Sequence, residues 1–403
     1  MTLAASASSE RGVALPLALV SLGLLVPLML AFASLSVSEP VIAANQLRAT
    51  QARALADSGL QYALWGLDTP VARGGLPSPL PASPAPAPFD GRTVVAVGLT
   101  GGFTVEVTNH VSGDPQARTV TAIGWVAASG HGAARAHRQV IADVAEIPHL
   151  GRRAPCALCV RGALGLAGNV AVDGTNRDPD CGGDGRHGTV SRDATTVTGP
   201  VALAGGAGGL LQHQPAGALD GVTLSPAALD ALRTLARRHG TYYGPGFPRG
   251  GTVSDGSARW DGRVVFDAAH PLRDGIVFVD AVDGRTEAPA AALASARLEP
   301  DGVAGADGVF RGWLVVNGAL DLAGGARLRG LVYAVDTLTY RGPGAGSLEG
   351  LAVALNAREA TTQLEAGAGG GLRVTFDCRA AGGAGLVPHG FALVPGTYRE
   401  ERD

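Results

Sequence analysis

The hydrophobic pattern of the chain begins with one long apolar segment. Residues 12–38 carry no charge, and a helix of this length can cross about 30 Å of hydrocarbon. Beyond Glu39 the pattern changes to leucines that recur near one face of a helix: Leu47, Leu55, Leu60, Leu64 and Leu67. Together the two parts predict one helix from about residue 13 to residue 67, roughly 80 Å long at about 1.5 Å per residue.

Short alternating runs follow between residues 92 and 150. Phe103, Val105 and Val107 alternate with polar residues, which is typical of a strand with one buried face. Similar runs are separated by Gly, Asn-His and Ser-Gly turns. We expect four such strands to pack on the second half of the helix.

From residue 151 the chain shows a repeating glycine pattern. Gly312, Gly330 and Gly350 precede the apolar runs WLVV, LVYAV and LAVAL at intervals of about twenty residues. This spacing favours the coils of a parallel β-helix, in which each coil stacks its apolar residues on the next. A Gly-rich β-sandwich is the alternative. One helix, 226–239, interrupts the region, with Ser225 as its N-cap and Gly240 at its end.

Composition supports a mainly β fold with one long N-terminal α-helix. The 403 residues include 60 Gly and 25 Pro, while aromatic residues make up only 5%, and this mixture disfavours a helical bundle. The formal net charge is −3, so composition provides no electrostatic reason to expect nucleic acid as a partner.

Two motifs in the predicted helix carry a family resemblance. RGVALPLALV opens the apolar segment, and ARALADSGLQYA lies in the second half of the helix. Together they resemble the PilX N-terminal domain family of type IV pilus assembly proteins, whose members are minor pilins or pseudopilins. The family motif has the form AxxAAEAGLxYA. Here Asp57 stands where the family usually has Glu, and Gly59 and Leu60 are in place.

The resemblance implies how the N-terminus is processed. Glu10-Arg11-Gly12 is similar to the end of a prepilin leader, so a prepilin peptidase would cut after Gly12 and leave Val13 as the new N-terminus. Major pilins carry an acid at the fifth mature position, whereas this chain has Leu17 there, which fits a minor subunit. Two alternatives remain: a signal peptide cut at the A-x-A site of residues 31–33, and a plain uncleaved anchor.

The patterns and the resemblance together divide the chain into six segments. They are a prepilin-type leader (1–12), a transmembrane and amphipathic pilin-type helix (13–68), a Pro-rich linker (69–91), a pilin-like β-sheet head (92–150), a Gly-rich β-helix-like body (151–380) with the inserted helix 226–239, and a C-terminal tail (381–403).

Four cysteines and one acidic loop are the candidate sites in the body. Cys156, Cys159, Cys181 and Cys378 are compatible with two disulfides, in three possible pairings, if the body lies outside the cytoplasm. The loop DGTNRDPDCGGDG is a weak Ca²⁺ candidate through five residues: Asp173, Asn176, Asp178, Asp180 and Asp184. It fails the EF-hand pattern, so we expect a solvated loop, and we expect no metal and no other cofactor.

Catalytic motifs are missing from the sequence. It contains no G-x-S-x-G, H-E-x-x-H or Walker loop. Asp321 and Asp336 are isolated acids on the regular coils, where we expect turn or ladder residues. The chain is therefore not expected to be an enzyme.

We expect a structural minor pilin or pseudopilin of a type IV pilus or related secretion filament, which primes or caps assembly and displays a β-rich body. Its expected partners are other pilins or pseudopilins, the assembly platform, the prepilin peptidase and the inner membrane, without nucleic acid. The expected topology is a single pass with the N-terminus cytoplasmic and the body periplasmic, followed by the pilus tip or cell surface. The alternative is a membrane-tethered β-helix enzyme or adhesin acting on surface polysaccharide.

Overall fold

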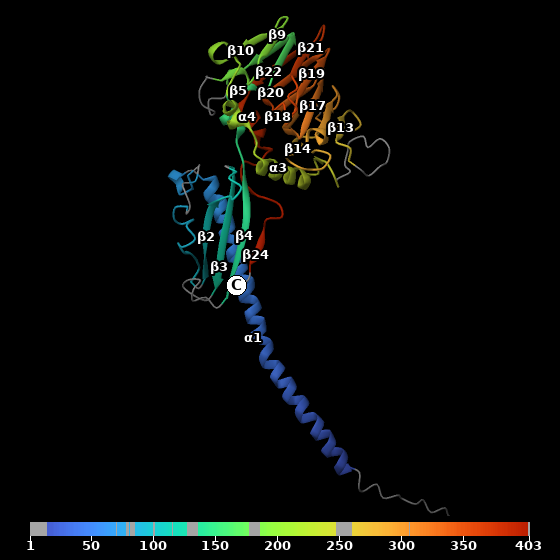
Figure 1. Ribbon diagram of the computed structural model, residues 1–403. Helices are drawn as coiled ribbons and strands as arrows, with labels where there is room; N and C mark the ends of the chain where they lie inside the picture. Colours follow the sequence, from blue (N-terminus) through green and yellow to red (C-terminus); the bar gives the residue numbers. More distant parts are fainter. Residues whose placement is uncertain are drawn as a thin grey trace, which may run out of the picture.

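A computed structural model describes residues 14–69, 71–77, 80, 85–99, 101–114, 116–126, 136–176, 186–246, 260–305 and 307–401. It shows three parts: a long N-terminal helix, a small antiparallel head and a larger body of parallel strands (Figure 1). The proposed cleavage point between Gly12 and Val13 lies outside the described residues.

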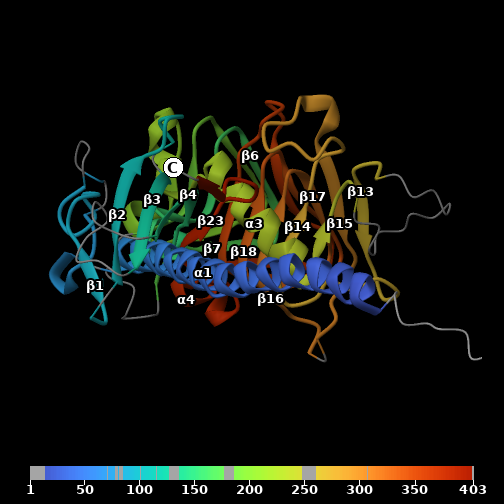
Figure 2. The ribbon, with the colours of Figure 1, turned by 90° about the horizontal axis from the view of Figure 1, so that it is seen from below.

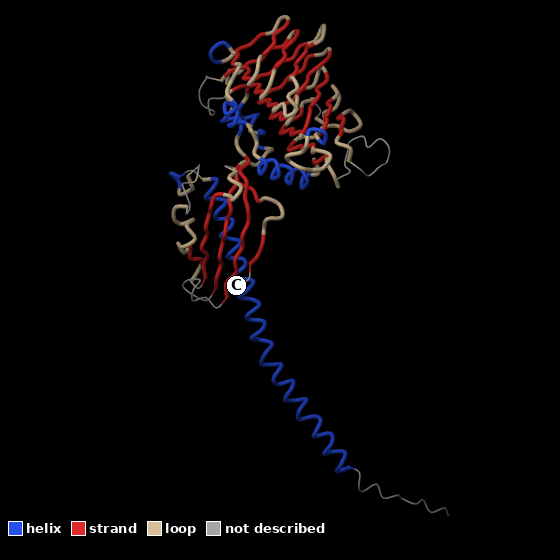
Figure 3. The backbone as a smooth tube through the Cα atoms, viewed as in Figure 1, coloured by secondary structure: helices blue, strands red, loops and turns tan. Residues whose placement is uncertain are grey.

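The helix α1 (Ala14–Asp68) continues through both Pro27 and Pro40. Its bounds agree with the long helix predicted from the two apolar patterns. Its first half extends away from the rest of the molecule, whereas its second half lies against the head (Figure 3). The short 3₁₀-helix η1 (Val71–Arg73) follows.

The head is an antiparallel sheet that packs on the second half of α1. It contains β1 (Val95–Val97), β2 (Gly101–Asn109), β3 (Ala117–Val126) and β4 (Ala136–Ile147), in that spatial order. The core between helix and sheet joins Ala56 and Leu60 of the helix to valines of the strands, among them Val105, Val120 and Val140. Their alternation along each strand places one face on the helix.

The C-terminal residues complete the head, which differs from the tail expected for 381–403. β23 (Gly390–Leu393) and β24 (Arg399–Glu401) both pair antiparallel with β4. The unpaired edge of a strand as long as β4 presents free N–H and C=O groups, and these two short strands satisfy part of that edge. The body is therefore inserted between β4 and β23 of the head.

The body contains two sheets in which every strand pair that the structure describes is parallel. One sheet holds β5 (Cys156–Val160), β7 (Val170–Asp173), β8 (His187–Ser191), β10 (Ala202–Ala204), β11 (Leu210–Leu211), β12 (Tyr242–Tyr243), β14 (Gly275–Val279), β16 (Phe310–Val316), β18 (Arg327–Ala334), β20 (Ala345–Ala354) and β22 (Gly371–Phe376). The other holds β6 (Leu164–Gly168), β9 (Thr195–Thr198), β13 (Arg263–Phe266), β15 (Ala294–Leu298), β17 (Gly318–Ala323), β19 (Leu338–Gly342) and β21 (Thr362–Ala366). Antiparallel sheets, as in a β-sandwich, are not what forms here.

The repeating glycines lie side by side in the first sheet. Gly275, Gly312, Gly330 and Gly350 are register partners in four neighbouring strands. Each has a positive φ, between 110° and 151°. A Cβ added at Gly330 would lie 1.7 Å from the carbonyl oxygen of Gly312. The glycine spacing noticed in the sequence is therefore a steric requirement of strand stacking.

The order of strands in space differs from their order in the chain. The chain alternates between the two sheets from β13 to β22, and then β21 pairs with β6 while β20 pairs with β5. The last strands of the body thus lie against its first strands. In the view from below, β13, β15 and β17 follow one another across the body, and β6 lies farther along the same sheet, beyond β19 and β21 (Figure 2).

Short helices connect the strands and the head. They are α2 (Leu150–Arg153), α3 (Pro226–His239), α4 (Cys378–Ala381), and the 3₁₀-helices η4 (Gly206–Gly208), η5 (Ala216–Val222), η6 (Ala290–Ala292) and η7 (Gly383–Gly385). α3 begins where Ser225 accepts a hydrogen bond from the Ala228 amide, 3.2 Å away, and ends at Gly240 in the left-handed conformation. It covers the β12 end of the body and also contacts β4 of the head (Figure 1).

Candidate functional site

The exposed half of α1 is the feature that most needs a functional explanation. Leu15–Phe32 is long and apolar enough to cross a membrane, and none of it is buried in the protein. Leu17, within this span, has 66% of its surface exposed. By length and composition, an apolar helix near the N-terminus is typical of a membrane anchor or of a signal sequence.

The motif ARALADSGLQYA forms the part of α1 that rests on the head. Ala52, Ala56, Leu60 and Ala63 are all at most 2% exposed, and they recur at helical spacing. A Cβ at Gly59 would lie 3.0 Å from the Cβ of Ala122 and 3.1 Å from the Phe103 ring. The small residues of the motif therefore let the helix lie close to the sheet.

The sheet contributes a matching glycine that sequence reasoning missed. A Cβ at Gly124 in β3 would lie 2.3 Å from both the Ala52 carbonyl oxygen and the Ala56 amide nitrogen. The backbone of α1 thus passes directly over Gly124, and no side chain can occupy that position without displacing the helix. An isolated glycine inside the strand pattern TAIGWV was the available signal.

Asp57, the acid of the motif, binds a residue that lies next to the head strand β24. Its carboxylate accepts a hydrogen bond of 2.7 Å from the hydroxyl of Tyr398, just before β24. Burial and this hydrogen bond to Asp57 both raise the pKa of Tyr398. Beside it, Glu400 forms ion pairs with Arg53 on α1, at 3.6 Å, and with Arg138 on β4, at 3.3 Å. These polar contacts tie α1 to the C-terminal strands.

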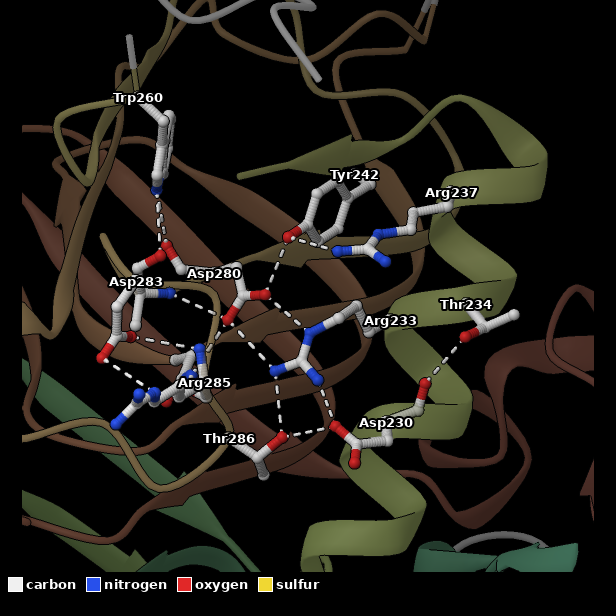
Figure 4. A network of polar contacts seen from close by, with 12 residues as sticks. Asp230, Arg233, Thr234, Arg237, Tyr242, Trp260, Asp280, Asp283, Arg285 and Thr286 are labelled. Carbon is white, nitrogen blue, oxygen red and sulfur yellow. Dashed lines mark hydrogen bonds and ion pairs between the residues drawn. The ribbon is translucent and has the colours of Figure 1, made fainter. Parts of the chain in front are cut away.

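A buried ionic network ties α3 to the end of the parallel sheet (Figure 4). Asp280, directly after β14, is fully buried, and its carboxylate accepts from the Arg233 guanidinium at 2.6 Å and from the Tyr242 hydroxyl at 2.8 Å. Burial alone would lower the pKa of Arg233, but the hydrogen bond and charge of Asp280 outweigh it and raise the pKa. Burial and the charge of Asp280 raise the pKa of Tyr242 to about 12.

Further contacts complete this network. Asn317 donates to Asp280 at 3.1 Å, Thr286 accepts from Arg233 at 3.0 Å, and Arg237 donates to Tyr242 at 3.1 Å. Because the charges of Arg233 and Asp280 compensate each other in a buried position, the network holds α3 over β12 and β14 at the end of the sheet. The sequence assigned only capping roles to this helix, so the buried pair of Arg233 and Asp280 was missed.

The four cysteines are placed as follows. Cys156 and Cys159 form a disulfide within β5, and both are fully buried. Cys378, at the start of α4, is also disulfide-bonded. Cys181 lies outside the described residues. Disulfides of this kind persist in oxidising compartments.

The weak Ca²⁺ candidate is only partly described. The Asp173 carboxylate accepts the backbone amide of Thr175 at 2.9 Å, and Asn176 is 9% exposed. Asp178, Asp180 and Asp184 lie outside the described residues. Within the described part of the chain, no group of three His, Cys, Asp or Glu residues could hold a metal ion.

The two acids considered for catalysis are engaged by neighbouring residues. Asp321 pairs with Arg297 at 3.2 Å and accepts a hydrogen bond of 2.8 Å from Thr339. Asp336, only 1% exposed, pairs with Arg358. Arg297 and Asp321 lie in paired strands, and Asp336 and Arg358 precede the paired strands β19 and β21, as expected of ladder and turn residues.

Comparisons with known proteins leave the family open. No protein-family model and no curated protein matches the chain. Among solved structures, it is similar to the competence-associated pilin ComZ from Thermus thermophilus, with 14% sequence identity over 88% of this chain and 98% of that chain. The TM-score of 0.20 is too low to establish a shared fold.

Proposed function

We propose that this protein is a minor subunit of a type IV pilus or related secretion filament. One observation carries the proposal: the exposed, uncharged span Leu15–Phe32 of α1 continues into a part of the helix whose small residues pack closely on an antiparallel sheet. The exposed half suits a lipid bilayer before assembly and the packed helices of a filament afterwards. The motifs RGVALPLALV and ARALADSGLQYA support the same assignment through their resemblance to PilX-type proteins.

The helix also suggests where in the filament the subunit sits. Lipid provides little hydrophobic drive between helices, so docking depends on close packing and on paired polar groups. Leu17 offers no carboxylate to the terminal amine of a neighbouring subunit. The protein would therefore add poorly to a growing shaft, and we assign it to initiation or to the tip, at low copy number.

The body is then the displayed part. Its alternation between two parallel sheets and its glycine ladder support a β-helix-like solenoid. The chain leaves the head after β4 and returns to it at β23, and the last residue of β4 pairs with the first of β23, so the body projects from one end of the head sheet (Figure 1). The partners would be other pilins, the assembly platform, the inner membrane and a prepilin peptidase, with the body periplasmic and later at the pilus tip or cell surface. The engaged states of Asp321 and Asp336 support a structural, non-enzymatic role.

N-terminal sequencing of the protein, produced with and without a prepilin peptidase, tests the proposal. We expect a mature chain that starts at Val13 only when the peptidase is present, and no processing of a Gly12→Val variant. A chain that starts at Ser34 in both cases would identify an ordinary signal peptide and exclude the filament role. Quantitative mass spectrometry of sheared filaments tests the minor status, which a level equal to the major pilin would contradict.

A further inference from the structure

A groove crosses the outer face of the larger parallel sheet of the body, over β18, β20, β22 and β7. Its volume is about 350 Å³. Six of the residues that line it are Asn169, Ala171, Arg327, Ser347, Gly371 and Arg373. No residue of the assembly helix α1 contributes to it.

Strand register explains why the sheet is hollowed here. Arg327, Ser347, Arg373 and Ala171 are successive register partners across four neighbouring strands, so they form one row. Their chain neighbours Leu328, Leu348, Val374 and Val172 are buried, which directs the row to the outer face. Ser347 is short and stands between the two arginines. The groove is therefore a gap in the row with a guanidinium-bearing residue on each side.

The spacing suits one ligand group held from both sides. Neighbouring strands lie about 4.8 Å apart, so the Cα atoms of Arg327 and Arg373 are about 10 Å apart across Ser347. Two arginine side chains at this separation can converge on a single anionic group. The Ser347 hydroxyl and the Asn169 amide, which also donates to the Gly370 carbonyl oxygen at 3.5 Å, add uncharged polar groups to the lining.

Charge sets these two arginines apart from others on the body. Arg297, Arg311 and Arg329 each pair with a carboxylate within 3.4 Å. In the described part of the chain, neither Arg327 nor Arg373 has an acid within ion-pair distance, and Arg327 donates only to the backbone carbonyl of Asp307. Two uncompensated cations thus face one groove on a chain whose net charge is −3.

We propose that this groove binds an acidic glycan, with Arg327 and Arg373 holding one carboxylate or sulfate group of a sugar. Planar guanidinium groups bind such oxyanions with paired hydrogen bonds. Ser347 and Asn169 then contact neighbouring sugar hydroxyls. Nucleic acid fits less well, because its backbone requires a longer basic stripe and its bases require aromatic platforms, and the lining residues that the structure describes include no aromatic side chain. The inference goes beyond the filament role and does not depend on assembly.

Calorimetric titration of the full-length protein in detergent micelles tests the site. The probes are a galacturonate hexasaccharide, a sulfated heparin hexasaccharide and neutral maltohexaose, and the first two separate carboxylate from sulfate recognition. We expect binding of at least one acidic probe, weakening with added salt, and no binding of the neutral one. Arg327→Met and Arg373→Met should each weaken binding about tenfold or more.

Arg263→Met is the matched control, because Arg263 is an exposed arginine on β13 of the other sheet. It should leave the affinity within about twofold. Equal weakening by all three variants would show a general charge effect and overturn the site, as would the absence of binding to both acidic probes. Binding of a single-stranded oligonucleotide through the same arginines, without binding of either glycan, would replace the glycan assignment. A Ser347→Arg variant, which fills the gap, should abolish glycan binding if the groove is correctly placed.

Discussion

Replacing Gly124 by alanine should weaken the packing of α1 against the head sheet. The new Cβ would lie 2.3 Å from the Ala52 carbonyl oxygen and from the Ala56 amide nitrogen, whereas ordinary contact begins at 3.4 Å. Both atoms belong to the helix backbone, so the helix itself must move by about 1 Å. Gly124 has no positive φ, and steric contact alone therefore decides the outcome.

The expected cost is about 2–3 kcal/mol, at the upper part of the range for overpacked cores. This strain should lower the free energy of the local opening in which the helix separates from the sheet. Since about 1.4 kcal/mol corresponds to a factor of ten, the hydrogen-exchange protection of the amides of residues 52–63 should drop about 30- to 150-fold. Exchange measured by mass spectrometry on the full-length protein in micelles gives this quantity directly.

Two alanine substitutions serve as comparisons. Gly59→Ala meets no backbone atom; its nearest neighbours are the Ala122 Cβ at 3.0 Å and the Phe103 ring at 3.1 Å, so the required displacement is only a few tenths of an ångström. The gain in helix propensity, about 1 kcal/mol, should offset that strain. Gly165→Ala in β6 has its nearest contact at 3.6 Å and should leave α1 unchanged. If Gly124→Ala also left the protection of residues 52–63 within about twofold, the helix would not rest on Gly124 and the packing argument would be refuted.

Three further predictions concern the body. Arg233→Met leaves the buried Asp280 carboxylate without its cation and should lower the free energy of unfolding, measured in urea, by about 3–5 kcal/mol. The control Arg238→Met replaces an exposed arginine and should change this free energy by less than about 0.5 kcal/mol. A loss below about 1 kcal/mol for Arg233→Met would contradict the network. Tyr242 should ionise near pH 12. Because this pKa lies above the ordinary 10.0, the stabilisation by the neutral hydroxyl is complete below pH 10 and is lost as the pH rises toward 12. The absorbance titration of the protein minus that of Tyr242→Phe isolates this tyrosine, and a midpoint near pH 10 would disprove the prediction. Asp321→Asn removes an exposed ion pair, so the free energy of unfolding should fall by no more than about 1 kcal/mol. The number of filaments should not change. A glycan-cleaving activity that is present in the unchanged protein and lost in this variant would instead reveal an enzyme.

Local signals in the sequence were sufficient for the two long helices, α1 and α3. The uncharged run of residues 12–38 and the leucine stripe after it predicted α1, and Ser225 and Gly240 marked the ends of α3, because caps and periodicity act between residues close in the chain. The glycine intervals at 312, 330 and 350 indicated repeated strands, since each of these paired strands must meet the same steric requirement as its neighbour.

The motif around Gly59 and Leu60 was recognisable, but its mechanical role was not. The glycine that receives the helix, Gly124, lies far along the chain, and Tyr398, which binds Asp57, lies near the opposite end. A sequence pattern describes each of these residues by its own neighbours, and the contacts between them exist only after the helix, sheet and C-terminus have come together.

The sequence by itself therefore determined the apolar helix, its small-residue motif, the capped helix α3 and the repeated glycine strands. Only the tertiary structure decided that β23 and β24 return to β4, that β21 lies beside β6, and that Arg233 meets Asp280. The same holds for Arg327 and Arg373, which two strand pairings bring to either side of Ser347. The physical reason is that these contacts join segments far apart in the chain, and the local pattern of neither segment identifies its partner.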